Sequence, residues 1–365
     1  MLKQVGLAFA ITTGLFGAGF NWNLPNTFPQ PYVPADNPMS EAKVELGRYL
    51  FYDKRMSVNG KESCGSCHRQ ELAFTDGRAR AEGTTGQSHP RSAMSLVNVA
   101  YAPTLTWANP TLDSLEQQAL IPMLGEDPVE LGLKGHEAEF LNKIKTDRIY
   151  RDLFPRAFRE EGEKYTLLNV TKAIAAFERS IISLRSPYDR YRWGGDMSAI
   201  SDSAKRGELL FSSSERGGCF QCHGGWNFSA VRFQGSPARE PEGNARGFFN
   251  TGVAEYLSPN RGLYEHTMRS ADIGKFRPPT LRNIAITAPY MHDGSMATLE
   301  EVIDHYADGG KLDHPNKTPI LRPFRLSETE KRDLIEFLRS LTDEELLHDP
   351  RWRDPWGRLT IEERR

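Results

Sequence analysis

Apolar residues recur at helical spacing in several segments of the chain, whereas the alternation that is typical of a strand is weak throughout. The clearest segment runs from Ser327 to Leu341 and opens with the residues of a capping box, Ser327 and Glu330. A second long segment of this kind runs from Leu167 to Leu184. The pattern predicts a mainly α-helical protein with little β-structure.

Two shorter amphipathic segments indicate an internal repeat. Glu41 to Phe51 contains Leu-Gly-Arg-Tyr-Leu-Phe, Ser203 to Phe211 contains Arg-Gly-Glu-Leu-Leu-Phe, and each segment precedes a pair of cysteines. A chain of 365 residues is long enough for two cores, and the helical pattern breaks between Arg185 and Ser201. We therefore expect two similar domains, at residues 21–190 and 191–346, followed by an extension at residues 347–365.

The N-terminus has the pattern of an export signal, because Lys3 is followed by an apolar stretch from Val5 to Gly19. A membrane anchor is the alternative, but the stretch contains glycines and is shorter than the roughly 20 residues that a span requires. We expect residues 1–20 to be a signal peptide, cleaved near Gly19 to Asn21. The expected location is the periplasm, with no membrane attachment after cleavage.

Composition agrees with an exported globular protein and narrows the choice of partners. Hydrophobic residues make up 38% of the chain, charged residues 26%, and the net charge is -2. Because there is no basic excess, we expect no nucleic-acid partner.

All four cysteines belong to two motifs of the same form, Cys64-Gly-Ser-Cys67-His68 and Cys219-Phe-Gln-Cys222-His223. Cysteines in an exported protein ordinarily predict disulfides, and a redox dithiol or half of a zinc site is a further alternative. None of these explains the histidine that follows both pairs. In a C-x-x-C-H motif the two thiols add to the vinyl groups of a haem, and the histidine binds the iron. The motifs predict two covalent c-type haems, one on His68 and one on His223.

The segment from Phe276 to Gly294 ends with Thr-Ala-Pro-Tyr-Met-His-Asp-Gly. With the two haem motifs, it resembles the bacterial di-haem cytochrome c peroxidases and their MauG-like relatives, over about Pro38 to Leu346. The resemblance implies two cytochrome c-like haem domains packed around an inter-haem interface. It also implies that the N-terminal haem reacts with hydrogen peroxide and that the C-terminal haem stores or relays electrons.

The sixth ligand of the second haem separates the branches of this family. The resemblance places it fourteen residues after the histidine of the His-Asp-Gly block, His292, and that position is Tyr306. A thioether ligand raises the reduction potential, whereas a phenolate lowers it and stabilises oxidised iron. Tyrosine here is typical of the MauG-like branch. The rivals are Met291 and Met296 at other spacings, the adjacent His305, and a core role for Tyr306.

The resemblance assigns one residue to coupling between the haems and two residues to the peroxide side of the first haem. Trp107 matches the tryptophan that couples the two haems, although core packing is the usual role of a lone tryptophan. Gln117 and Glu130 match the glutamine and glutamate on the peroxide side, where a group must take a proton from peroxide and return it. Glu126 is the neighbouring alternative to Glu130.

Two further features concern the access of peroxide to the first haem and the binding of a metal ion. The stretch from Arg80 to Gln87 lacks the histidine that blocks the first haem in the methionine-ligated peroxidases, and His89 lies further along. We therefore expect the diferric protein to react with peroxide directly. The family also carries a calcium ion between the haems, held partly by backbone carbonyls, and Thr287 and Pro289 occupy those positions.

Three functions are compatible with these residues. We favour a MauG-like oxidase, in which hydrogen peroxide generates a high-valent di-haem state that oxidises a residue, expected to be tryptophan, on a periplasmic partner protein. The overall similarity points to the MbnH-like group, whose partner binds copper. The alternatives are a cytochrome c peroxidase fed by a small redox protein and a non-enzymatic electron carrier. Tryptophans at 193, 226, 352 and 356 are interpreted as packing residues rather than a docking surface.

Overall fold

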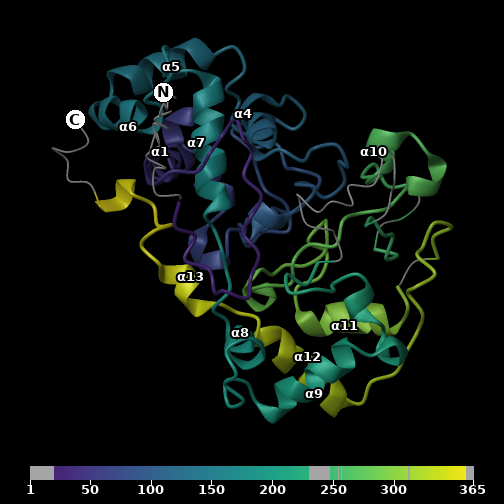
Figure 1. Ribbon diagram of the computed structural model, residues 1–365. Helices are drawn as coiled ribbons and strands as arrows, with labels where there is room; N and C mark the ends of the chain where they lie inside the picture. Colours follow the sequence, from purple (N-terminus) through teal and green to yellow (C-terminus); the bar gives the residue numbers. More distant parts are fainter. Residues whose placement is uncertain (1–19, 230–246, 254, 256, 311–312, 359–365) are drawn as a thin grey trace, which may run out of the picture.

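The computed structural model describes residues 20–229, 247–253, 255, 257–310 and 313–358, so the expected signal peptide lies almost wholly outside the described residues. The protein is mainly helical (Figure 1), and β-structure in the described ranges consists of isolated bridges. The α-helices are α1 (Glu41–Phe51), α2 (Cys64–Cys67), α3 (Leu115–Gln118), α4 (Leu120–Leu124), α5 (Glu137–Thr146), α6 (Arg148–Ala157), α7 (Leu167–Arg179), α8 (Pro187–Arg192), α9 (Asp202–Phe211), α10 (Tyr264–Thr267), α11 (Leu299–Ala307), α12 (Glu328–Arg339) and α13 (Glu344–His348). Short 3-10 turns are Lys54–Met56, Gln70–Leu72, Val99–Tyr101, Ser214–Arg216, Cys219–Gln221, Ser270–Asp272, Ile284–Ile286 and Trp356–Arg358. The predicted fold class is confirmed.

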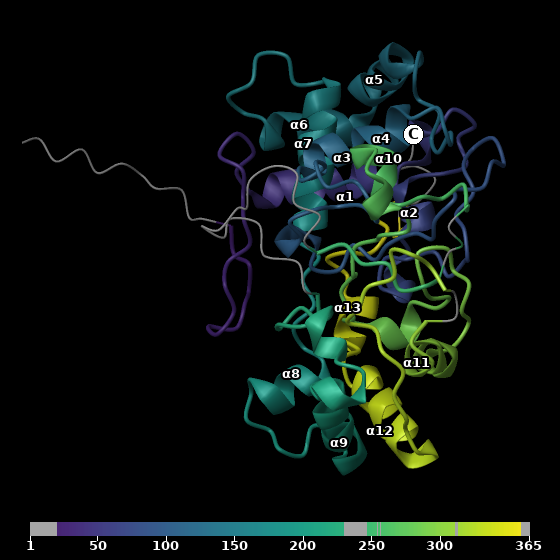
Figure 2. The ribbon, with the colours of Figure 1, turned by 90° about the vertical axis from the view of Figure 1, so that its right-hand side faces the viewer.

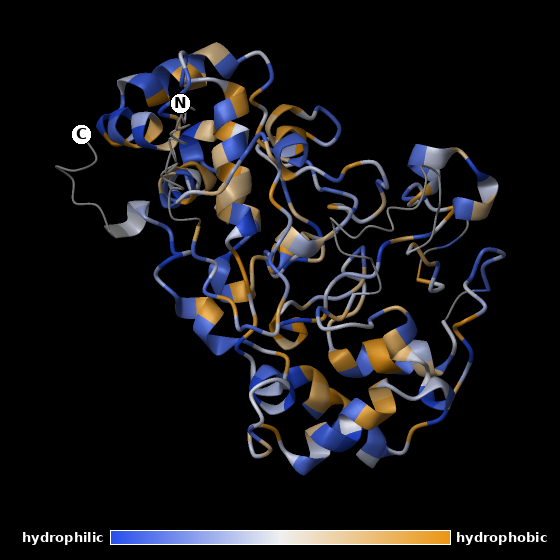
Figure 3. Cartoon of the chain, in the orientation of Figure 1, coloured by the Kyte–Doolittle hydropathy of each residue, from blue (hydrophilic) through white to orange (hydrophobic). Residues whose placement is uncertain are grey.

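Two groups of helices form two hydrophobic cores. Helices α1, α5, α6 and α7 lie together at one end of the molecule, and α8, α9, α11 and α12 at the other, in both views (Figures 1 and 2). The helices are amphipathic, so each shows both hydrophobic and hydrophilic stretches (Figure 3). Irregular segments occupy much of the space between the two groups (Figure 1).

The two groups are built by the same helix crossing. Helix α1 packs against α7, and α9 against α12, more extensively than any other pairs. At each crossing a glycine lets the backbones meet: a Cβ atom on Gly47 would lie 1.9 Å from the carbonyl oxygen of Ala173, and one on Gly207 would lie 2.0 Å from that of Asp333. The repeated Leu-Gly and Arg-Gly segments of the sequence are therefore the repeated contact points of the fold.

Helix α7 ends earlier than its apolar pattern predicts. The expectation was a helix to Leu184, but α7 ends at Arg179. Beyond it the backbone bonds to another segment: the amide of Asn98 donates to Ile181 at 2.9 Å, and the amide of Ser183 donates to the Asn98 side chain at 2.8 Å. These bonds replace the helical ones, so apolar residues continue while the helix does not.

The described part of the C-terminal extension, residues 347–358, packs on the first core. Leu346, Leu347 and Trp352 are buried in the same cluster as α1 and α7. The indole of Trp352 donates to the carbonyl of Ser180 at 3.1 Å, and that of Trp356 donates to the carbonyl of Tyr49 at 2.9 Å. The interpretation of these two tryptophans as packing residues is confirmed. No helix within the described ranges has the length and apolarity that crossing a membrane requires.

Candidate functional site

The first Cys-x-x-Cys-His motif lies on a short helix that presents its histidine in one tautomer. Cys64 and Cys67 delimit α2, which Ser63 begins with a capping box, and neither cysteine forms a disulfide. Nδ1 of His68 lies 2.9 Å from the carbonyl oxygen of Phe74. Because a carbonyl accepts but does not donate, Nδ1 carries the proton and Nε2 is left with its lone pair for a metal. Burial lowers the pKa of His68, which favours the neutral form that ligates iron.

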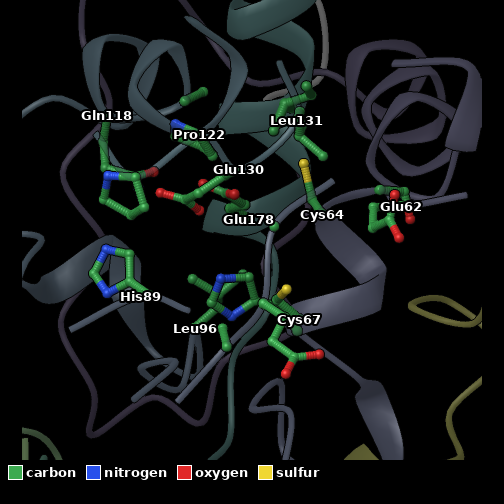
Figure 4. A pocket seen from close by; sticks show the side chains of 18 of the residues that line it. Glu62, Cys64, Cys67, His89, Leu96, Gln118, Pro122, Glu130, Leu131 and Glu178 are labelled. Atoms are coloured by element: carbon green, nitrogen blue, oxygen red, sulfur yellow. The ribbon is translucent and has the colours of Figure 1, made fainter. Parts of the chain in front are cut away.

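A cavity of about 740 Å³ opens beside this motif (Figure 4). Both cysteines and His68 form part of its wall, and the polar side chains of Gln118, His89, Glu130 and Glu178 form another part. Apolar residues including Leu96, Leu131 and Ile174 complete the lining. Thiols, an imidazole and an apolar slot are the groups that a covalently attached haem requires, so the residues present fit the cofactor.

Glu130 is held in this cavity by a tight loop contact. The amide of Thr84 donates to its carbonyl at 2.8 Å, and a Cβ on Gly83 would lie 1.9 Å from the carbonyl oxygen of Val129. Burial raises the pKa of Glu130 to about 7, a value suited to both accepting and returning a proton near neutral pH. The rival Glu126 is exposed and forms an ion pair with Lys134. The structure therefore brings Glu130, and not Glu126, to the cavity.

The glutamine of this cavity is Gln118 rather than the predicted Gln117. Gln117 is exposed on α3, whereas Gln118 lines the cavity beside Glu130. Adjacent residues of a helix point about 100° apart, because an α-helix has 3.6 residues per turn, so a register error of one residue turns the side chain away. The structure thus brings Gln118, and not Gln117, to the cavity, and the role predicted for Gln117 stays a prediction.

Two residues of the cavity wall went unassigned in the sequence analysis. His89 reaches the wall from the loop after residue 80, and its Nδ1 accepts from the amide of Arg91 at 3.1 Å. Glu178 lies in α7, is buried, and its Oε2 accepts no hydrogen bond from the residues that the structure describes. Burial raises the pKa of Glu178 to about 8, so it is protonated at neutral pH. In the sequence, the position of Glu178 at the end of the apolar run Ala-Ile-Ala-Ala-Phe was the feature that could have indicated a buried glutamate.

The second motif presents its histidine in the same way. Cys219 begins a 3-10 turn, and neither Cys219 nor Cys222 forms a disulfide. Nδ1 of His223 lies 3.2 Å from the carbonyl of Phe228 and 3.1 Å from that of Pro279. Two carbonyl acceptors again place the proton on Nδ1, and burial lowers the pKa of His223 to about 4.

A cavity of about 1380 Å³ adjoins the second motif and contains the expected sixth ligand. Tyr306 projects from α11 into this cavity, which His223 also lines. Burial raises the pKa of the Tyr306 phenol, so an iron ion would have to offset that cost when the phenolate forms.

The rival ligands differ in their surroundings. Nε2 of the rival His305 is 2.8 Å from the carbonyl of Thr251. Met291 also lines the cavity, whereas Met296 is buried in the second core.

A buried cation also faces this second cavity. Arg277 lines it, is 8% exposed, and donates to the carbonyl of Thr106 at 3.1 Å and to the sulfur of Met94 at 3.4 Å. Burial lowers the pKa of Arg277 to about 10, so it remains charged at neutral pH. Its side-chain hydrogen-bond partners among the described residues are neutral, and a buried charge requires a counter-charge. The carboxylates of a haem would supply one, which is a second respect in which the residues fit the cofactor.

Trp107 lines the second cavity and is tied to both halves of the molecule. Its indole donates to the carbonyl of Ser92 at 2.9 Å, and its own carbonyl accepts from the amide of Arg277 at 2.8 Å. Its ring lies 6.5 Å from that of His292, which stacks on Phe276 at 3.7 Å. His292 lines the same cavity, and burial lowers its pKa to about 4. The structure thus brings Trp107 and His292 together at the second haem site.

The candidate calcium ligands lie on the loop that precedes Tyr290. Thr287 and Pro289 are partly buried, and the Thr287 hydroxyl donates to the carbonyl of Ile284 at 3.2 Å. No group of three or more His, Cys, Asp or Glu side chains suited to a metal occurs within the described ranges. Calcium at this loop stays a prediction.

Comparison with known proteins agrees with this geometry. A family model described as "Di-haem cytochrome c peroxidase" matches residues 41–197. The cytochrome-c peroxidase IdrP1 of Denitromonas iodatirespirans is 36% identical over 95% of this chain and 96% of its own length. The methylamine utilization protein MauG of Methylorubrum extorquens is 35% identical over 88% of this chain and 83% of its own. A crystal structure of a MauG-like protein associated with microbial copper homeostasis superposes with a TM-score of 0.86, at 44% identity over 93% of this chain and 100% of that one.

Proposed function

The chain belongs to the di-haem cytochrome c peroxidase family, and from this premise we propose that it is a peroxide-dependent oxidase that removes electrons from a residue of a partner protein. As a family member it is an oxidoreductase with two c-type haems. The observation that carries the finer proposal is Tyr306, which lines the second haem cavity. A phenolate ligand favours oxidised iron over reduced iron, which suits an enzyme that starts from the diferric form.

When bound, the haems supply the electron transfer, and the chain's own residues accept and donate the proton. At the first cavity Glu130, with its pKa near 7, accepts a proton from hydrogen peroxide and returns one to the leaving oxygen. The amide of Gln118, on the same wall, orients the peroxide by hydrogen bonding. The apolar residues of the wall exclude bulk water, which strengthens these polar contacts.

The partner in this proposal is a periplasmic protein that binds copper, and the oxidised residue is a tryptophan. Support comes from the 44% identity to a MauG-like protein associated with microbial copper homeostasis. The apolar stretch after Lys3 supports export to the periplasm. A second candidate is a cytochrome c peroxidase fed by a small redox protein. It is supported by the similarity to IdrP1, which bears the name of a peroxidase, and by Met291, which also lines the second cavity.

One experiment separates these candidates. Stoichiometric hydrogen peroxide is added to the purified diferric protein, and the visible and near-infrared spectra are recorded. The oxidase proposal expects an immediate, long-lived spectral change with a new near-infrared band. If no change occurs until one haem has been reduced, the protein is a peroxidase of the second kind and the oxidase proposal fails.

A further inference from the structure

A continuous series of aromatic contacts leads from the second haem motif to the protein surface. Trp226 follows His223 by three residues, and its ring lies 5.3 Å from that of Phe28 in an edge-to-face contact. Phe28 in turn lies 5.6 Å from Trp193, also edge to face. Phe28 is buried, whereas Trp193 is 44% exposed. One phenyl ring therefore separates an indole on the loop of the second haem motif from an indole that is partly exposed to solvent.

Trp226 is connected to the ligand histidine by a short path. Nδ1 of His223 is hydrogen-bonded to the carbonyl of Phe228 at 3.2 Å, two residues from Trp226 along the chain. The amide of Phe228 bonds back to Gly225, so this segment is a tight turn. The loop that holds His223 is the loop that carries Trp226.

The backbone segments that carry the two tryptophans are joined through Asp189 and Arg282. The guanidinium of Arg282 donates to the carbonyl of Trp226 and makes two bonds, of 2.8 and 3.0 Å, with the carboxylate of Asp189. The backbone carbonyl of Asp189 accepts from the amide of Trp193 at 2.9 Å. Arg282 and Asp189 are buried, and such an ion pair positions its neighbours firmly. These bonds connect the backbone of the loop that carries Trp226 to the C-terminal end of α8, where Trp193 lies.

The chemistry of these residues determines the direction in which an electron hole moves along the series. Indole loses an electron more readily than phenol or phenyl groups that keep their protons, and electron transfer slows steeply with distance, so two short steps are faster than one long step. Arg282 lies 5.5 Å from the ring of Trp226 and disfavours a positive charge there. Trp193 is exposed to water, which stabilises a positive charge. A hole on Trp226 thus moves outward to Trp193.

Among the described residues, the ring of Tyr101 also contacts Trp226, but Tyr101 is buried, so a hole on it would remain inside the protein. Its ring lies 4.7 Å from Trp226, but it is buried, and its hydroxyl donates to the carbonyl of Pro29 at 2.7 Å. Oxidation of a phenol requires that its proton be taken up, and a backbone carbonyl is not a base for it. Among the described residues, the aromatic contacts of Trp226 that reach an exposed ring run through Phe28 to Trp193.

We propose that Trp226 and Trp193 form the exit route for oxidising equivalents, and that Trp193 is the surface residue through which the partner is oxidised. This inference rests on the proposed function. Each hydrogen peroxide takes up two electrons and two protons and yields two waters. The electrons travel inward one at a time, from the partner residue to Trp193, then to Trp226 and the haems, and the partner residue loses two electrons and two protons in all.

The test locates the oxidised surface residue in the holoenzyme without a partner. A nitroso spin trap is present while stoichiometric peroxide is added, and peptide mass spectrometry identifies the labelled residue. The variants are Trp193→Phe, Trp226→Phe and, as a matched control, Trp356→Phe, whose indole packs on Tyr49 far along the chain. The ferric haem spectrum of each variant verifies that it folds.

We expect label on Trp193 in the unmodified protein, at least a tenfold loss of that label in Trp226→Phe, and no loss in Trp356→Phe. The peroxide-induced spectrum should form in all three variants, because none of the replaced residues lies in the peroxide cavity. Equal labelling of Trp193 in Trp226→Phe, or labelling of other surface residues in place of Trp193, would overturn the route.

The experiment distinguishes failure of the oxidase proposal from failure of the electron route. If the diferric protein does not react, the oxidase proposal fails, and the labelling is repeated on enzyme with one haem reduced. Trp193 label that depends on Trp226 would still support the route there. An unlabelled Trp193 in enzyme that has consumed peroxide would overturn it.

Discussion

Ionisation of Glu130 should control the pH dependence of the reaction with peroxide. Burial raises its pKa to about 7, and the carboxylate form is the one that accepts the proton of peroxide. The stopped-flow rate of the peroxide-induced spectral change should therefore rise as pH increases through 7. Glu130→Gln should slow it by about 10²- to 10⁴-fold and remove this rise. Glu126→Gln, at the exposed rival position, is the control, and an unchanged pH profile in Glu130→Gln would exclude the role.

Tyr306 should set the potential of the second haem. Tyr306→Met replaces a phenolate by a thioether, so the reduction potential should rise by a sizeable part of the roughly 0.8 V range that axial ligands cover. Redox titration measures this shift, and the variant should need prior reduction before it reacts with peroxide. Tyr290→Phe, which alters another tyrosine of the same cavity wall, should leave the potential in place. A Tyr306→Met protein with an unchanged potential would show that Tyr306 is not the ligand.

Glu178 should make stability depend on pH. Its pKa is about 8 when folded and near 4.5 when unfolded, so the unfolded state releases its proton first. The contribution of this group to stability is thus full below pH 4.5 and is lost as pH rises toward 8. Relative to the unmodified protein, Glu178→Gln should gain thermal stability between pH 5 and pH 8. Equal melting-temperature shifts at both pH values would contradict a protonated Glu178.

At the scale of elements, the two helix crossings should depend on glycine. Gly47→Ala and Gly207→Ala would each place a methyl group within about 2 Å of a carbonyl oxygen of the facing helix, and overpacking of this kind costs about 1–3 kcal/mol. Thermal denaturation should show a clear loss of stability in both variants. Gly162→Ala, where a Cβ would meet open space, is the matched control and should be nearly neutral. Two stable variants would mean that the helices can separate at little cost.

The helices also show which of their boundaries the pattern of apolar residues can predict and which it cannot. The amphipathic spacing predicts a helix from Glu41 to Phe51, and α1 has those bounds. Helix α12 likewise begins after the predicted cap, Ser327. The end of α7 could not be predicted, because it depends on hydrogen bonds from Asn98, which is distant in sequence.

At the scale of the whole molecule, Trp107 should couple the two haem sites. Its hydrogen bonds join Ser92, in the segment that leads to the first site, to Arg277 at the second. Trp107→Phe removes the indole and its bond to Ser92, so the near-infrared band formed with peroxide should be lost or strongly weakened while both haems stay attached. Near-infrared spectroscopy and a haem assay measure the two effects, with Trp356→Phe as control. An intact band in Trp107→Phe would show that coupling follows another path.

The sequence alone determined the chemistry that depends on short spacing. Two cysteines and a histidine within five consecutive residues must lie together in any fold, so both haem motifs could be identified before the structure. The same holds for helices whose caps and apolar positions are local. Resemblance then led to the family, to Glu130 and to Tyr306, which the structure brings to the two cavities.

Tertiary structure alone decided which distant side chains share a site. Gln118 rather than Gln117 faces the first cavity because the rotation of α3 depends on its packing, and His89 and Glu178 join it from a loop and a helix far apart in the chain. Phe28, Trp193 and Trp226 share no sequence pattern, yet their rings contact one another edge to face from the loop of the second haem motif to the surface. Such contacts arise when two cores and the irregular segments between them pack together, and no local periodicity records that packing.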